Sequence, residues 1–172
     1  MTGNALIVGY GNPLRGDDGV GQAIAQAFAD ADAIDGVDAL ACHQLTPELA
    51  ERFAAAARVV LIDVAAGREA GRVSVTPLQP APAPASTLGH HVEPAQLLYL
   101  AQALYGRSPE AYLVTVGAGS LELGEGLSPL VIAALPELEF GAFPATAFHL
   151  YRSQLRPGGS VYTKLAEFPF QS

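Results

Sequence analysis

The sequence predicts an α/β fold in which a mostly parallel β-sheet lies between layers of helices. Short apolar runs rich in branched residues recur along the chain, as in strands that are covered on both faces. Segments with apolar residues at helical spacing follow most of these runs. Because a strand, a helix and a second parallel strand connect by right-handed crossovers, this alternation indicates one sheet between two helical layers.

The expected strands differ in how clear their pattern is. Residues 59–62, Val-Val-Leu-Ile, form the clearest run, which is short, branched and continuous. Residues 72–76 fit an exposed strand at the edge of the sheet, and residues 77–85 are rich in proline and alanine, which predicts an extended loop. The expected strands are residues 5–8, 37–42, 59–62, 72–76 and 111–116.

The expected helices are marked by capping residues and by proline in the first turn. Asp17 or Asp18 stands where it could cap the first helix. At the second helix, Thr46 supplies a hydroxyl cap, Pro47 occupies the first turn and Glu48 lies near the positive end of the helix dipole. The expected helices begin near residues 19, 46, 93 and 128, and the first ends near residue 29.

The last part of the chain does not continue this pattern. Pro136, Gly141 and Pro144 interrupt any long closing helix. We therefore expect residues 1–138 to form an αβα domain and residues 139–172 to form a divergent tail that is part of the same domain. The tail could pack as a hairpin, form a subunit contact or be loosely ordered.

The composition excludes several classes of function. Half of the 172 residues are hydrophobic and 15% are charged, against roughly 25% in an average soluble protein, which is typical of a compact globular chain. A net charge of -8 leaves no basic face for nucleic acid. The single cysteine, Cys42, suits a reducing compartment. Because no apolar run reaches the ~18 residues of a membrane span and no signal peptide precedes the first strand, we expect a cytoplasmic protein.

The most informative segment is residues 9–21, Gly-Tyr-Gly-Asn-Pro-Leu-Arg-Gly-Asp-Asp-Gly-Val-Gly. It directly follows the first expected strand and leads into the first expected helix. It therefore delivers two adjacent carboxylates, Asp17 and Asp18, to the start of that helix. Ligands of open α/β sheets bind at the carboxyl ends of the strands, so we expect these acids to face a cation or a polar scissile group.

Further candidates for chemistry lie after the other strands. Asp63 follows the central strand, where a buried carboxylate needs a partner. His90 and His91 stand just before the third helix, within loop reach of the same sheet edge. Two carboxylates and one imidazole form a plausible site for a divalent first-row metal with positions open for substrate. His43 has no supporting context in the sequence.

Two other chemistries receive little support. The dinucleotide fingerprint is incomplete, because Leu14 stands where a third glycine should follow Gly9 and Gly11. Two carboxylates at the helix start would also repel a pyrophosphate. Cys42 has no activating context and no Gly-x-Ser-x-Gly segment is present, so an acyl-enzyme mechanism is not indicated.

Residues 9–21 resemble the opening motif of the hydrogenase maturation proteases, the endopeptidases that trim the C-terminus of the large subunit of nickel-iron hydrogenases. Residues 61–65 are similar to the central strand of that family and its acid, residues 90–98 to its histidine segment, and residues 117–131 to its later glycine-rich loop. The resemblance covers about residues 4–135 and implies a three-layer αβα sandwich with a mostly parallel sheet.

The resemblance also implies a metal-binding triad. Its second acid falls on Asp18, its strand-end acid on Asp63 and its histidine on His90, with His91 as the alternative. The resemblance implies that the metal is a nickel ion that the substrate already carries. Two hard oxygens and an imidazole could contact this ion without removing it from softer thiolate ligands. Asp18 and Asp63 are also the catalytic candidates, while Asp17 could assist catalysis or serve as a cap or loop stabiliser.

The resulting hypothesis is an aspartate-type, nickel-dependent processing endopeptidase whose partner is a nickel-iron hydrogenase large-subunit precursor. One alternative is a non-catalytic nickel or assembly chaperone on the same fold. The other is a nucleotide-binding domain, which the glycine-rich loop alone suggests. The sequence names neither the group that attacks the peptide bond nor the particular hydrogenase.

Overall fold

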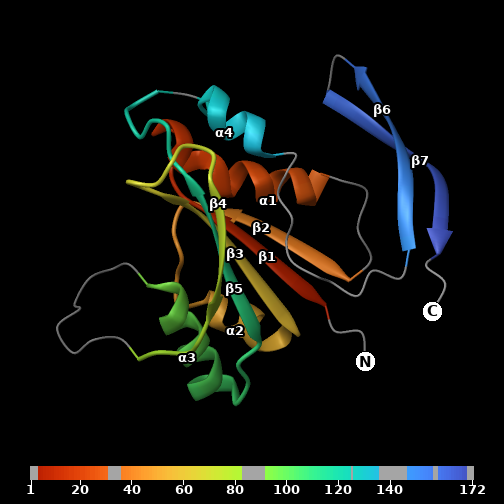
Figure 1. The fold of residues 1–172 in the computed structure, drawn as a ribbon. Coiled ribbons are helices and arrows are strands. Elements are labelled where there is room, and N and C mark those ends of the chain that lie inside the picture. Colours follow the sequence, from red (N-terminus) through yellow and green to blue (C-terminus); the bar gives the residue numbers. More distant parts are fainter. Residues whose placement is uncertain are drawn as a thin grey trace. The chain divides into compact units, whose positions relative to one another are not determined.

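The computed structural model describes residues 4–30, 36–82, 92–124 and 126–135, together with the backbone of residues 147–156 and 159–169. The chain divides into two compact units, Met1–Leu138 and Glu139–Ser172, and each is described by itself (Figure 1).

Among the described residues, the first unit contains a five-stranded sheet with the strand order β2-β1-β3-β5-β4. β2, β1, β3 and β5 run parallel to one another, and β4 pairs antiparallel with β5 at one edge. The predicted mostly parallel sheet is therefore confirmed. The strands are β1 (Ala5–Tyr10), β2 (Val37–Cys42), β3 (Arg58–Ala65), β4 (Val73–Leu78) and β5 (Glu110–Gly117).

Helices cover both faces of this sheet, with α1 on one side and α2 and α3 on the other (Figure 1). The described chain thus forms the three-layer α/β sandwich expected from its sequence. None of the described helices combines the length and the apolar character needed to cross a membrane. The helical elements are the single 3-10 turn η1 (Gly16–Gly19) and the helices α1 (Val20–Asp30), α2 (Leu49–Ala55), α3 (Pro94–Tyr105) and α4 (Pro129–Ala134).

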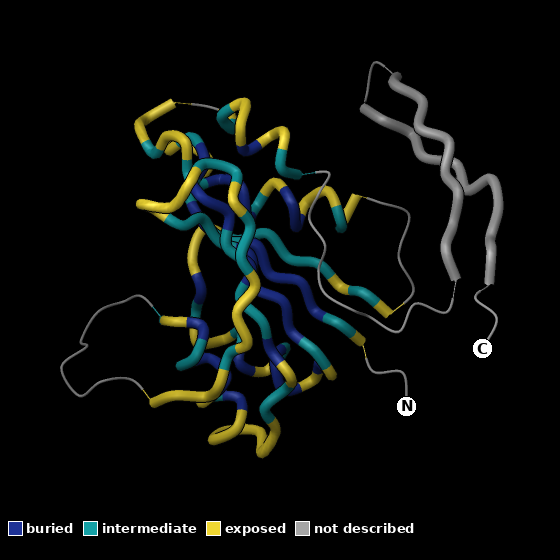
Figure 2. The backbone as a smooth tube through the Cα atoms, viewed as in Figure 1, coloured by how far each residue is buried: buried dark blue, intermediate teal, exposed yellow. Residues whose placement is uncertain are grey.

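The alternation of side chains along the central strands builds the two cores. Leu6 and Val8 of β1 pack in one buried cluster with Phe53 of α2 and Leu97 of α3. Ile7, between them, is also buried and points to the opposite face, on the side of α1. Figure 2 shows the buried positions concentrated in β1 and β3, as expected for parallel strands covered on both faces.

Three predicted boundaries are corrected by the structure. α2 begins at Leu49 and not at Thr46, because residues 46–49 first form a turn in which the Leu49 N–H donates to the Thr46 carbonyl. α1 begins at Val20, after the 3-10 turn. β4 continues through Pro77, which was expected to start a loop. A proline is tolerated there because β4 is an edge strand.

The start of α3 agrees with its prediction. Glu93 and Gln96 form a reciprocal capping box, in which the Glu93 N–H donates to the Gln96 side chain at 3.0 Å. Pro94 occupies the first turn, and Gly106 ends the helix in the left-handed conformation with φ 72°. The entrance to α3 is therefore fixed by local interactions.

The second unit contains an antiparallel hairpin of β6 (Ala147–Arg156) and β7 (Gly159–Pro169). Its register is irregular between Leu150 and Tyr151. Of the three alternatives considered for the tail, the structure contains the hairpin.

β1 and α1 approach each other closely at Gly9, and this contact leads to a prediction about stability. A Cβ on Gly9 would overlap the Gly21 carbonyl oxygen and lie 2.8 Å from the Ala25 Cβ. We expect Gly9→Ala to lower the free energy of unfolding by about 2 kcal/mol or more, measured by urea denaturation. Gly124→Ala is the control, because nothing lies within 4 Å of its added Cβ. Equal stability of the two variants would contradict the tight packing of α1 on β1.

Candidate functional site

A cleft of about 510 Å³ lies at the carboxyl end of the parallel strands. Tyr10 ends β1, His43 directly follows β2, and Asp63 lies near the end of β3. The turn η1 adds Asp18, and the entrance to α3 adds Glu93. The cleft therefore occupies the sheet edge at which ligands of open α/β folds bind.

Asp63 is a partly buried carboxylate in this cleft. Its Oδ1 accepts a hydrogen bond from the Val64 N–H at 2.7 Å, and its side chain is also hydrogen-bonded to Tyr10. Burial raises the pKa of Asp63, and the negative charges of Asp18 and Glu93 raise it further, while the hydrogen bonds oppose this shift. Because the pKa is raised, a nearby cation would stabilise the ionised form of Asp63.

Asp18 is held by the loop that precedes it. Its Oδ2 accepts a hydrogen bond from the Asn12 N–H at 3.0 Å, and the Asn12 side chain in turn accepts one from the Leu14 N–H at 3.0 Å. The structure thus brings Asp18 and Asp63, two of the three predicted ligands, to one cleft.

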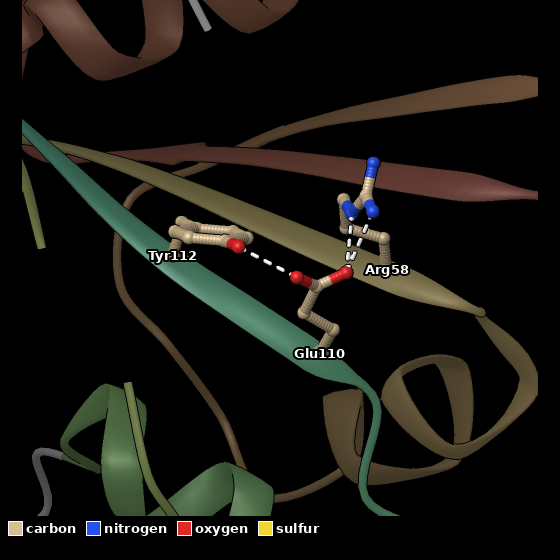
Figure 3. A network of polar contacts seen from close by, with 3 residues as sticks. All are labelled: Arg58, Glu110 and Tyr112. Atoms are coloured by element: carbon tan, nitrogen blue, oxygen red, sulfur yellow. Dashed lines mark hydrogen bonds and ion pairs between the residues drawn. The ribbon is translucent and has the colours of Figure 1, made fainter. Parts of the chain in front are cut away.

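The described residues contain two ion pairs, and neither includes a carboxylate of the cleft. They are Arg52–Asp38 and Arg58–Glu110. Figure 3 shows the second pair, in which Glu110 accepts hydrogen bonds from Arg58 at 2.6 and 2.8 Å and from the Tyr112 hydroxyl at 2.6 Å. Glu110 lies at the amino end of β5, away from the cleft, and is neutralised by its ion pair with Arg58.

The third predicted ligand is not placed by the structure. His90 and His91 both lie outside the described residues. Val92 and Glu93, which follow them in the sequence, line the cleft. Within the described part of the chain, no three His, Cys, Asp or Glu side chains are grouped closely enough to hold a metal ion.

Asp17 has a structural role and does not line the cleft. Its side chain is fully buried and accepts four hydrogen bonds: from the N–H groups of Gly119, Ser120 and Ser128 at 2.7, 2.9 and 2.6 Å, and from the Ser128 hydroxyl at 2.8 Å. Burial alone would raise the pKa of Asp17, but these hydrogen bonds outweigh it and hold the pKa below its ordinary value.

The capping role predicted for Asp17 or Asp18 is therefore wrong. No side chain caps η1, and both carboxylates bind loop groups instead. Asp17 stabilises the loop between β5 and α4, which was one of its two predicted alternatives. This places the glycine-rich loop and the later loop against each other.

The sequence interpretation missed several residues of the cleft. His43, Tyr10 and Arg15 all line it, yet none was a candidate. The position of His43 directly after the strand at residues 37–42 was the available signal, because the carboxyl ends of parallel strands meet at one edge. Tyr10 and Arg15 belong to the glycine-rich segment itself.

The buried carboxylate of Asp17 predicts a pH-dependent contribution to stability. Asp17→Asn should lower the free energy of unfolding at neutral pH by about 3 kcal/mol, because an amide replaces one acceptor oxygen with a donor. Since the folded-state pKa lies below the ordinary value of 3.8, the wild-type advantage is complete above about pH 4 and is lost as the pH falls through the folded-state pKa.

Denaturation of both proteins between pH 2 and 7 measures this difference. Glu122→Gln, at an exposed position of the loop whose N–H groups bind Asp17, is the matched control and should remain close to the wild type throughout. A difference between Asp17→Asn and the wild type that does not change with pH would contradict the proposed electrostatic origin.

No protein-family model matches the chain, and no curated protein matches it. Several solved structures share its fold, including a nickel-iron hydrogenase maturation protease from Thermococcus kodakarensis, with a TM-score of 0.61 and 23% identity. The match covers 76% of this chain and 84% of that one.

Two further structures give the same result. A hydrogenase maturating endopeptidase from E. coli has a TM-score of 0.61 at 23% identity, over 78% of this chain and 86% of its own. A hydrogenase 2 maturation peptidase from a Thaumarchaeota archaeon has a TM-score of 0.57 at 26% identity, over 76% of this chain and 90% of its own. The chain therefore shares the fold of the hydrogenase maturation proteases, and its glycine-rich segment at residues 9–21 resembles the opening motif of that family.

Proposed function

We propose that the chain is a processing endopeptidase that removes a C-terminal peptide from a nickel-iron hydrogenase large-subunit precursor once nickel has been inserted. The observation that carries this proposal is the pair Asp18 and Asp63, which line one cleft without a cationic partner among the described residues. The solved proteins with the same fold are named as maturation proteases and endopeptidases, which supports the same conclusion.

The chemistry of the two carboxylates fits a nickel ion that belongs to the substrate. Their oxygens are hard donors, and nickel held by thiolates in a precursor would keep its stronger bonds while exposing a free position. The upward-shifted pKa of Asp63 reflects burial and neighbouring negative charges, which an incoming cation would relieve. His90 is proposed as the third ligand, with His91 as the alternative.

Hydrolysis of a peptide bond by direct attack of water requires an activated water molecule and a proton for the departing amine. Asp18 and Asp63 are the groups of this cleft that we propose to serve these steps, by accepting a proton from water or by holding the ion that polarises the scissile carbonyl. The single cysteine suits a reducing compartment, so we place the reaction in the cytoplasm.

The direct test is mass spectrometry of a nickel-loaded large-subunit precursor from the same organism, before and after incubation with the protein. We expect one defined C-terminal peptide to be lost, and the nickel-free precursor to remain at full length. Binding without any loss of mass would instead support the non-catalytic chaperone.

Substitutions test which side chains of the cleft take part in cleavage. Asp18→Asn, Asp63→Asn and His90→Ala should each slow cleavage by about a hundredfold or more, since each removes a proposed ligand or proton acceptor. The cleavage rate of His91→Ala, compared with that of His90→Ala, decides which of the two histidines is the ligand. Asp38→Asn is the control, because Asp38 pairs with Arg52 away from the cleft. Cleavage at the wild-type rate by Asp18→Asn and Asp63→Asn would contradict the proposed site.

A further inference from the structure

Two leucines lie at neighbouring positions on the loops beside the cleft. Leu14 is 56% exposed and Leu123 is 87% exposed, the highest value among the large apolar side chains described as exposed. The Gly124 N–H donates to the Leu14 carbonyl at 3.0 Å, and Arg15 pairs with Gly124 in a parallel bridge. This register sets Leu14 opposite Leu123, and the two residues are called the leucine rim below.

The backbone under the leucine rim is fixed by several hydrogen bonds. The Gly16 N–H donates to the Gly124 carbonyl at 3.1 Å, and the Asp17 N–H donates to the Ser120 carbonyl at 3.0 Å. The buried Asp17 carboxylate joins the same two loops. Because these loops are held before any partner arrives, little ordering entropy would be lost when a partner binds to them.

The leucine rim is built from the same loop as the candidate ligand Asp18. Asn12 donates its N–H to Asp18 and accepts the Leu14 N–H on its side chain, so one residue fixes both positions. Arg15, directly after Leu14, lines the cleft. Because Asn12 and Arg15, on either side of Leu14, both line the cleft, a polypeptide bound at Asp18 would lie beside this loop.

Single exposed leucines are common on protein surfaces, whereas exposed apolar side chains that lie together mark interaction sites. Leu104, which is 67% exposed on the last turn of α3, represents the ordinary case, because no residue beside it lines the cleft. The leucine rim differs from it in being paired, fixed by hydrogen bonds and joined to the cleft through Arg15.

We propose that the leucine rim binds an apolar segment of the precursor polypeptide next to the bond that is cut. This inference rests on the proposed function, and it names the surface that places the precursor in register with Asp18. The contact is to the polypeptide and not to the metal, so it contributes to binding of the nickel-loaded and the nickel-free precursor alike.

The test compares the double variant Leu14→Ser/Leu123→Ser with the wild type in cleavage of the nickel-loaded precursor. We expect KM to rise about tenfold or more while kcat stays within twofold, because a lost binding contact acts equally on ground state and transition state. Leu104→Ser is the control of matched exposure and should leave both constants unchanged. An unchanged KM in the double variant would overturn the inference.

Calorimetry with the nickel-free precursor gives a second readout that needs no cleavage. We expect its Kd to rise about tenfold in the double variant. If the double variant does not fold, Leu123→Ser alone serves, since that side chain is almost fully exposed. A wild-type dimer that the double variant abolishes, with an unchanged Kd for the precursor, would assign the surface to a second copy and overturn the inference.

These readouts separate the two proposals. If the wild type leaves the nickel-loaded precursor at full length, the proposed function fails, while the calorimetric comparison still decides the role of the leucine rim. If the wild type cuts and both proteins bind the precursor equally, only the leucine rim is disproved.

Discussion

The buried carboxylate of Asp17 is the interaction on which the architecture of the cleft depends. A fully buried charge is costly unless its oxygens are satisfied, and here three backbone N–H groups and one hydroxyl do so. These donors come from the loop between β5 and α4, whereas Asp17 belongs to the turn after β1. The residue after it, Asp18, is therefore presented to the cleft from a rigid support.

The carboxylates at the two ends of the sheet have different surroundings, and their pKa values shift in opposite directions. At the amino end, Glu110 is paired with Arg58, and hydrogen bonds from Tyr112 and Arg58 lower the pKa of that carboxyl (Figure 3). At the carboxyl end, burial and neighbouring negative charges raise the pKa of Asp63. Among the described residues, the carboxylates of the cleft form no ion pair, and carboxylates in that situation favour a cationic partner. This contrast supports the proposed recognition of a metal-bearing substrate.

Local patterns in the sequence predicted most of the fold. The branched run at residues 59–62 and the Glu93–Pro94 helix start depend on neighbours in sequence, and both are confirmed. The capping role of Asp17 was wrong because its partners lie 102 to 111 residues away, where no local pattern reveals them. His43 was missed for a related reason, since its place in the cleft depends on the order of the strands.

The most direct measurement is a crystal structure of the protein with added Ni²⁺, in which anomalous scattering locates the metal. We predict one ion in the cleft, bound by a carboxylate oxygen of Asp18, one of Asp63 and a nitrogen of His90, at about 2.0–2.2 Å by analogy with zinc sites. An ion bound elsewhere, or one that contacts neither Asp18 nor Asp63, would contradict the shared metal site.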